Sequence, residues 1–260
     1  MKTALKKPTR TLIFIMIVLA ISGMLIARAY YGNINQSIDP RVKYARELYS
    51  QYDKYAQVGD FYKVLALLDS IENIYSATNC YKNSYELGVL YNNRAATLLT
   101  IGLYADSIPA LYNPYTELNA DSIVSLSEDY VMQAISIYHD WDSRFSGKSS
   151  EQIRESINVT FLEGFEEVDP KLQEKYLDAR VKEIEKSLQE NQRRLSVCYT
   201  NLGIVYREKG LYKDAVIYYE KALSLWDRNL TAENNLNRLL GKPLKKRNFI
   251  QKIFPPDRDQ

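Results

Sequence analysis

The chain has 260 residues, of which 46% are hydrophobic and 25% charged, and its formal net charge is +2. These values are ordinary for a folded protein and argue against a disordered chain, and the absence of a large basic patch argues against a nucleic-acid partner. Only 10 glycines and 8 prolines interrupt the sequence. Because helix breakers are scarce, we expect an all-α fold. The 22 tyrosines suit helix pairs that bury a ring and leave its hydroxyl in water.

Residues 11–27 form an apolar run without charge, and four basic residues precede it, the last of them Arg10. The run is at the short end of a membrane-spanning helix, so residues 1–30 are predicted to be a membrane anchor. A cleaved secretory signal is the alternative, because Ala27 to Ala29 has the small-x-small form of a cleavage site. A buried core helix is the third interpretation.

The distribution of basic residues around this run bears on topology. It favours a single-pass protein with its N-terminus in the cytoplasm and its body on the periplasmic, extracytoplasmic side. The opposite topology stays open. If the segment is a cleaved signal, the product would be a soluble periplasmic protein.

Two similar short sequence motifs occur in the chain. G-L-Y-A-D-S-I begins at Gly102, and G-L-Y-K-D-A-V begins at Gly210. Around the second copy, large and small residues fall at helical spacing, at Tyr199, Leu202, Gly203 and Tyr206 before the turn and at Ala215, Tyr219 and Ala222 after it. This spacing predicts a helical hairpin over residues 196–229, in which Gly203 and Ala222 lie where the two backbones approach closely.

The 196–229 segment resembles the tetratricopeptide repeat in this pattern of large and small residues, and it departs from the family at Asp227, where proline is preferred. The resemblance implies a tetratricopeptide-type α-solenoid. A second repeat fits residues 88–138, through Tyr91, Ala95 and Leu98. Because Pro109 and Pro114 would break its second helix, we expect an insertion over residues 108–126 and a helix that resumes at Ser127.

Four further segments complete the predicted helical domain, residues 31–240. A weaker repeat covers residues 45–78, with its turn at Gly59 and Asp60. Asp169 and Pro170 predict the start of one helix over residues 170–208. Between the second and third repeats, residues 143–168 are expected to be irregular, with one short helix after Ser149. A helix over residues 231–240 should cover the last hairpin, and residues 241–260 form a basic, flexible tail.

The long helix carries an apolar stripe at heptad spacing, at Val181, Ile184, Leu188, Leu195, Cys198 and Leu202, interrupted by Asn191. Such a stripe is typical of a dimerising coiled coil, which would make the protein a homo-oligomer. It is equally typical of a solenoid helix that packs on its neighbours. We favour packing on neighbouring helices.

Stacked hairpins of this kind carry no catalytic chemistry, and the resemblance implies that the first helices of the repeats line a concave binding groove. The expected groove residues are Val197, Thr200, Ile204, Arg207 and Glu208 in the last repeat, Val89, Asn92, Ala96, Leu99 and Thr100 in the second, and Arg46, Tyr49, Asp53, Ala56 and Gln57 in the first. Their mixture of apolar and polar side chains predicts that the groove holds a peptide or helix of a protein partner, not a carboxylate terminus.

Metal and cofactor chemistry are not expected. Cys80, Cys198 and the single histidine, His139, cannot supply the four ligands of a structural zinc site. We expect both cysteines in the core and His139 on the surface, and we assign no catalytic residue.

The leading functional prediction is a membrane-anchored interaction scaffold, similar to the anchored tetratricopeptide subunits of bacterial secretion, pilus or envelope-assembly machines. A structural protein that self-associates through the long helix is one alternative. An enzyme is the other, with a site in the insertions built from Asp121, Glu163, Glu166 and Glu167.

Overall fold

The computed structural model describes residues 16, 37–104, 107–109, 112–248 and 251. Across these ranges every regular element is helical, which confirms the all-α class. The elements are α2 (Lys43–Tyr49), α3 (Tyr52–Gln57), α4 (Phe61–Ala77), the 3-10 helix η1 (Asn79–Tyr81), α5 (Tyr85–Tyr104), α6 (Ala120–Phe145), α7 (Ser150–Leu162), α8 (Pro170–Glu208), α9 (Tyr212–Leu225) and α10 (Leu230–Leu239). The predicted anchor, residues 11–27, lies outside the described residues apart from Met16.

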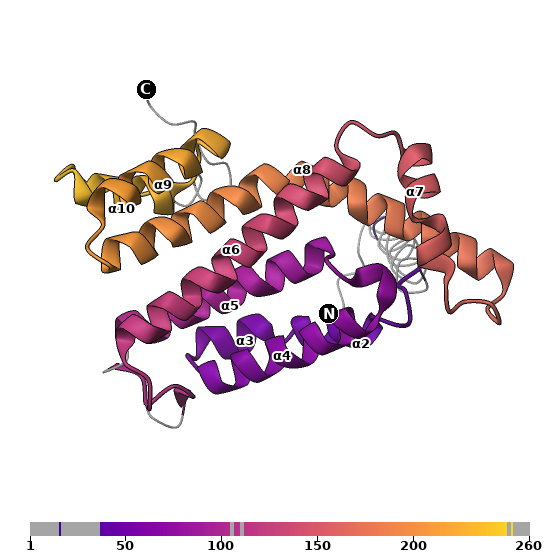
Figure 1. Ribbon diagram of the computed structural model, residues 1–260, viewed down its shortest axis with the longest axis horizontal. Coiled ribbons are helices and arrows are strands. Elements are labelled where there is room, and N and C mark those ends of the chain that lie inside the picture. Colours follow the sequence, from indigo (N-terminus) through magenta and orange to yellow (C-terminus); the bar gives the residue numbers. More distant parts are fainter. Residues whose placement is uncertain (1–15, 17–36, 105–106, 110–111, 249–250, 252–260) are drawn as a thin grey trace, which may run out of the picture.

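Three helical hairpins lie side by side in the molecule (Figure 1). In the first, α2 and α3 together pack on α4; in the second, α5 packs on α6; in the third, the C-terminal half of α8 packs on α9. The three hairpins include residues from the segments 45–78, 88–138 and 196–229. Helix α10 packs on α9 and α8, as predicted for the helix after the last repeat, and α7 packs on the first half of α8.

The third hairpin has the close backbone approach that its small residues predict. A Cβ added at Gly203 would lie 2.4 Å from Cε1 of Tyr219, whose ring is fully buried. Nearby, the Ser196 hydroxyl donates to the carbonyl oxygen of Ala222 at 2.7 Å. The turn itself contains Gly210 with φ +75°, a conformation that glycine adopts without steric cost.

Helix α8 has the predicted bounds, because its first turn and its end are both specified locally. The Asp169 carboxylate accepts from the backbone N–H of Lys171 at 2.9 Å, and Pro170 occupies the first turn. The residues of its apolar stripe pack inside the chain: Val181, Ile184, Leu195, Cys198 and Leu202 are buried, and Leu188 is half-buried against the same core. Asn191, which interrupts the stripe, is buried and donates to the Tyr138 carbonyl at 3.2 Å.

The insertion in the second repeat is shorter than predicted. Helix α6 begins at Ala120 and not at Ser127, because the Asn119 side chain caps it by accepting from the backbone N–H of Ser122 at 2.8 Å. The first repeat differs as well, since its first helix is broken into α2 and α3 at Ser50 and Gln51.

The segment between the second and third repeats is more helical than predicted. Helix α6 continues to Phe145, and α7 runs for 13 residues from Ser150. A capping box between Ser149 and Gln152 starts α7 and explains its stability. The predicted short helix after Ser149 is therefore confirmed, and the irregular part shrinks to the turns on either side of α7.

The first part of the basic tail contacts the last helix. The Asn234 amide and the backbone of Lys245 bond to each other twice, at 2.8 and 2.9 Å. The Lys245 ammonium also lies 3.2 Å from the Glu233 carboxylate on α10. Within residues 241–248, Lys245 therefore contacts the last helix, α10.

Candidate partner-binding groove

A cavity of about 240 Å³ opens between the first helices of the hairpins. Its lining comes from α2 (Arg46, Tyr49), α4 (Tyr75), α5 (Tyr85, Glu86, Val89, Leu90) and α8 (Arg194). Three of these residues, Arg46, Tyr49 and Val89, belong to the predicted groove. The cavity therefore overlaps the predicted groove at these three positions.

The walls of this cavity combine apolar and aromatic side chains with the charged side chains of Arg46, Glu86 and Arg194. Tyr85 is 7% exposed, and its buried hydroxyl lies beside the Arg194 guanidinium. Burial raises the pKa of Tyr85, so the hydroxyl stays protonated and able to donate. Tyr49 is held at the edge, where its ring stacks on Tyr52 at 5.8 Å and its hydroxyl accepts from Asn93 at 2.9 Å.

A chain of ion pairs runs from the groove lining, at Arg46 and Glu86, to α8 and joins three helices. Arg46 of α2 pairs with Glu183 of α8 at 2.6 Å; Arg180 of α8 pairs with Glu183 at 3.2 Å and with Glu86 of α5 at 2.5 Å. Burial alone would lower the pKa of Arg46, but the hydrogen bond and charge of Glu183 outweigh it and raise the pKa. Burial alone would raise the pKa of Glu86, but Arg180 lowers it. Arg46, Arg180 and Glu86 therefore stay charged at neutral pH.

The predicted groove residues of the last two repeats divide into two groups. Val197, Ile204, Arg207 and Ala96 are half-buried and Glu208 is exposed, so these side chains are accessible as predicted. Thr200, Asn92 and Leu99 are buried, and their prediction as groove residues is wrong. None of these residues lines the cavity described above.

The buried residues make contacts both within and between the hairpins. The Asn92 side-chain oxygen accepts from Asn201 of α8 at 2.9 Å, and the Thr200 hydroxyl oxygen accepts from Asn229 at 2.9 Å. Leu99 packs in a small core with Val124 of α6 and Val205 of α8. Helices α5 and α8 are in direct contact at this point. The part of the predicted groove that contains Asn92, Leu99 and Thr200 is therefore not accessible.

The remaining predicted residues of the first repeat do not reach the cavity. Asp53 and Gln57 lie exposed on α3, and Ala56 is half-buried there. In the second repeat, the Thr100 hydroxyl donates to the carbonyl oxygen of Ala96 on its own helix. The break between α2 and α3 leaves only the α2 residues on the groove wall.

Three important lining residues escaped the sequence reasoning. Tyr85 and Glu86 precede the predicted start of the second repeat, and Arg194 precedes that of the third. Helix α5 begins before residue 88, and α8 begins long before residue 196, so both add wall beyond the repeat boundaries. The predicted start of the long helix at residue 170 was a signal that could have placed Arg194 on the wall.

The carboxylates of the alternative enzyme site are not brought together as one group. Asp121 lies in the first turn of α6, whereas Glu163 and Glu166 lie in the turn between α7 and α8. These two segments lie at opposite ends of the molecule (Figure 1). Within the described ranges, no group of three His, Cys, Asp or Glu side chains is placed to hold a metal ion.

The cysteines and the histidine have the following surroundings. Cys198 is fully buried as predicted, whereas Cys80 is half-buried at the edge of η1, and neither forms a disulfide. His139 is exposed on α6, as predicted, with Nε2 3.2 Å from the Tyr199 hydroxyl oxygen.

The chain matches no protein-family model, and no curated protein or solved structure matches it either. Among the described residues, no helix is both long enough and apolar enough to cross a membrane.

Proposed function

We propose that this chain is a membrane-anchored interaction scaffold of the tetratricopeptide type, whose groove holds a peptide or helix of a protein partner in an envelope assembly. The observation that supports the proposal best is the cavity between α2, α5 and α8, since it combines an apolar wall with three residues that the repeat pattern independently placed in the groove. The anchor rests on the sequence of residues 11–27.

The shape and chemistry of the cavity favour one large apolar side chain as its occupant. Apolar area dominates the wall formed by Val89 and Leu90, and the Tyr85 hydroxyl offers a buried donor beside it. Arg46 and Arg194 at the cavity would favour a carboxylate or a backbone carbonyl on the flanking residues of the partner. Anchoring of an aromatic or branched side chain in such a pocket is a common mode of peptide and helix recognition.

The test combines alanine substitutions on the groove wall with capture of partners from native membranes. Tyr49→Ala with Val89→Ala should weaken capture by about 2 kcal/mol, roughly thirtyfold, because both side chains form the walls of the anchoring pocket. The matched control is Tyr212→Ala with Ile217→Ala on α9, two apolar side chains that are 59% and 58% exposed. Equal losses for both double variants would contradict the groove proposal.

The anchor has its own test. The full-length protein should sediment with membranes and resist carbonate extraction, and its body should be digested when protease is added to spheroplasts. A soluble product that begins at Tyr30 would contradict the anchor and would support a cleaved signal instead.

A further inference from the structure

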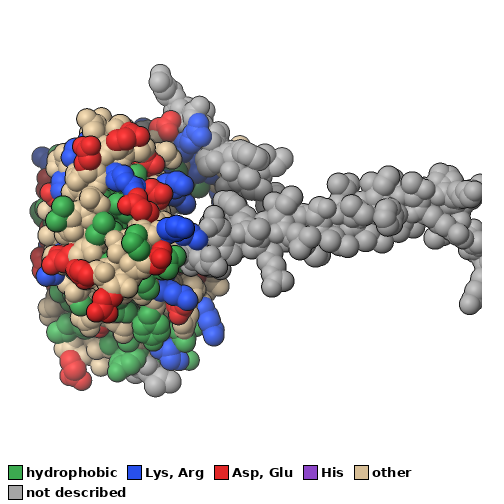
Figure 2. All heavy atoms as spheres, turned by 90° about the vertical axis from the view of Figure 1, so that its right-hand side faces the viewer, with side chains coloured by type: hydrophobic (Ala, Val, Ile, Leu, Met, Phe, Trp, Pro, Cys, Tyr) green, Lys and Arg blue, Asp and Glu red, His purple; other side chains and the backbone are tan. Residues whose placement is uncertain are grey.

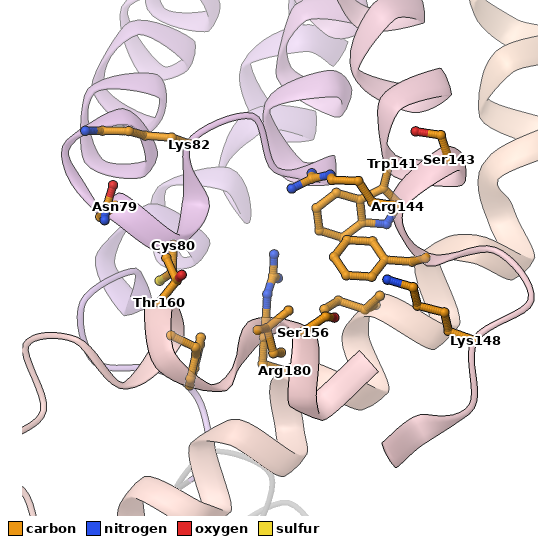
Figure 3. A pocket seen from close by; sticks show the side chains of 14 residues that line it. Asn79, Cys80, Lys82, Trp141, Ser143, Arg144, Lys148, Ser156, Thr160 and Arg180 are labelled. Atoms are coloured by element: carbon orange, nitrogen blue, oxygen red, sulfur yellow. The ribbon is translucent and has the colours of Figure 1, made fainter. Parts of the chain in front are cut away.

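A second and larger cavity, of about 460 Å³, lies where η1, the end of α6, α7 and the middle of α8 meet (Figure 3). It is separate from the groove cavity, and the two share no lining residue. Its volume is within the range of pockets that hold small molecules. Nothing in the proposed scaffold function uses it.

The floor of this cavity is a rigid aromatic and aliphatic surface. Trp141, Phe145 and Phe161 are 3%, 4% and 1% exposed, and Ile157 and Ile184 continue the apolar wall. The rings of Trp141 and Phe145 meet edge to face with centroids 4.7 Å apart. The Trp141 indole N–H donates to the Ser187 hydroxyl at 2.8 Å, which fixes the orientation of the ring. The floor is therefore formed before any ligand arrives.

Four cationic side chains line the cavity, and no carboxylate does: Lys82, Arg144, Lys148 and Arg180. Figure 3 shows Arg144, Lys148 and Arg180 pointing inward from different sides, and Lys82 at the rim with its ammonium directed away from the other three. On the end of the molecule formed by α7 and the start of α8, acidic and basic side chains are mixed (Figure 2). The cationic lining is thus a local feature and not part of a uniformly basic surface.

Nearby carboxylates neutralise only part of this charge. Arg180 is paired with Glu86 and Glu183 behind the cavity wall. Arg144 has its Nε atom 3.0 Å from the Asp140 carboxylate, but this buried N–H makes no hydrogen bond within the described residues. At the rim, Glu163 accepts from the amide of Asn79 at 2.8 Å.

The cations and the rings are combined in one surface. The Arg144 guanidinium lies 4.9 Å from the Trp141 ring centroid and 5.1 Å from that of Phe145, and the Lys148 ammonium lies 5.8 Å from Phe145. A ligand with an apolar ring could therefore contact the aromatic floor while its anionic group reaches the cations above it. A purely apolar ligand would leave those charges unmatched.

We propose that this cavity binds a small amphipathic anion, with one carboxylate or phosphate group held by Lys148 and Arg144, additional positive charge from Lys82 at the rim, and an apolar body on Trp141 and Phe161. The inference does not depend on the groove function. Carboxylate and phosphate share the property that the cavity selects, an oxyanion that accepts several charge-assisted hydrogen bonds.

Isothermal titration of the full chain with 1-naphthoate, 1-naphthyl phosphate and 1-naphthalenemethanol tests this proposal. The two anions should bind at least tenfold more tightly than the neutral alcohol, and the tighter of the two identifies the head group. Lys82→Gln with Lys148→Gln should weaken anion binding about tenfold, and both lysines are exposed, so the fold should persist.

Two controls separate a built site from a general charge effect. Lys171→Gln with Lys213→Gln changes the net charge equally at exposed positions outside the cavity and should alter affinity less than twofold. Ser156→Trp, from the exposed lining of α7, should fill the cavity and abolish binding while the melting curve stays cooperative.

Equal binding of the neutral alcohol, equal loss in the control double variant, or full binding by the Ser156→Trp protein would each overturn the proposal. The Tyr49→Ala, Val89→Ala variant of the groove should bind the anion normally. Failure of the groove proposal and failure of this one are therefore distinguishable.

Discussion

Replacing Gly203 by alanine tests the central contact of the third hairpin. The added Cβ would lie 2.4, 2.5 and 2.9 Å from Cε1, Cδ1 and Cζ of Tyr219. Carbon atoms prefer a separation of about 3.5 to 4.0 Å, so the ring or the whole of α9 must move by roughly 1 Å. Because Tyr219 is fully buried, its ring has no free space into which to rotate.

The expected magnitude follows from two opposing terms. Overpacking of a buried site costs about 1 to 3 kcal/mol, whereas alanine is better than glycine inside a helix by about 1 kcal/mol. We expect Gly203→Ala to lower the free energy of unfolding by up to about 2 kcal/mol net. Thermal unfolding followed by circular dichroism should then show a midpoint lower by about 2 to 4 °C for each kcal/mol.

Gly102→Ala is the matched control, because it makes the same change inside helix α5, where the added Cβ has more room. Its Cβ would meet Val124 Cγ2 at 3.2 Å, a contact that a small side-chain shift can relieve. We expect this variant to be neutral or slightly stabilised. Tyr219→Leu should reduce the penalty of Gly203→Ala, with a coupling of at least about 1 kcal/mol in a double-mutant cycle. A Gly203→Ala protein that melts like the Gly102→Ala control would refute the close approach of α8 and α9.

Three other predictions address packing and electrostatics. Ala222→Phe, at a fully buried position of α9, should cost about 1 to 3 kcal/mol of unfolding free energy in urea titration, and an unchanged midpoint would mean that the hairpin register is wrong. Arg94→Met should cost about 2 kcal/mol, because the Arg94 guanidinium bonds Asp69 and Glu72 of α4 at 2.5 and 2.8 Å; no loss would show that these ion pairs are fully offset by desolvation. The lowered pKa of Glu86 contributes stability that is present above the ordinary carboxyl pKa of about 4.3 and is lost as pH falls through the lower folded value. Glu86→Gln should therefore flatten the fall in stability below about pH 4, and an unaltered acid profile would remove Glu86 from the explanation.

Local signals in the sequence predicted the helices well, because the determinants of each helix lie within a few residues. Asp169 and Pro170 specify the start of α8, and the Gly210 turn separates α8 from α9. The Asn119 cap was not predicted, because a capping residue is recognisable only when the segment after it is predicted to be helical. Pro109 and Pro114 instead predicted that this segment was an irregular insertion. The break between α2 and α3 contains no proline or glycine and has no equally clear signal.

The groove was only partly predictable, because burial depends on how neighbouring hairpins are spaced. Arg46, Tyr49 and Val89, which the repeat pattern assigned to the groove, line the cavity between α2, α5 and α8. The repeat pattern also assigned Asn92 to the groove, but Asn92 is instead bonded to Asn201 across the interface between α5 and α8. A pattern read within one repeat does not contain the distance to the next repeat. The second cavity depends on α7, a segment that lies outside the repeat pattern altogether.

Site-specific photocrosslinking from the groove wall tests the proposed function most directly. A benzophenone amino acid at Val89, in the full-length protein in native membranes, should give one discrete adduct with a partner protein, and Tyr49→Ala should weaken that adduct. The same benzophenone amino acid at Tyr212, an exposed residue of α9, should not give this adduct. An adduct of the chain with itself, or the same adduct from both positions, would contradict partner binding in the groove.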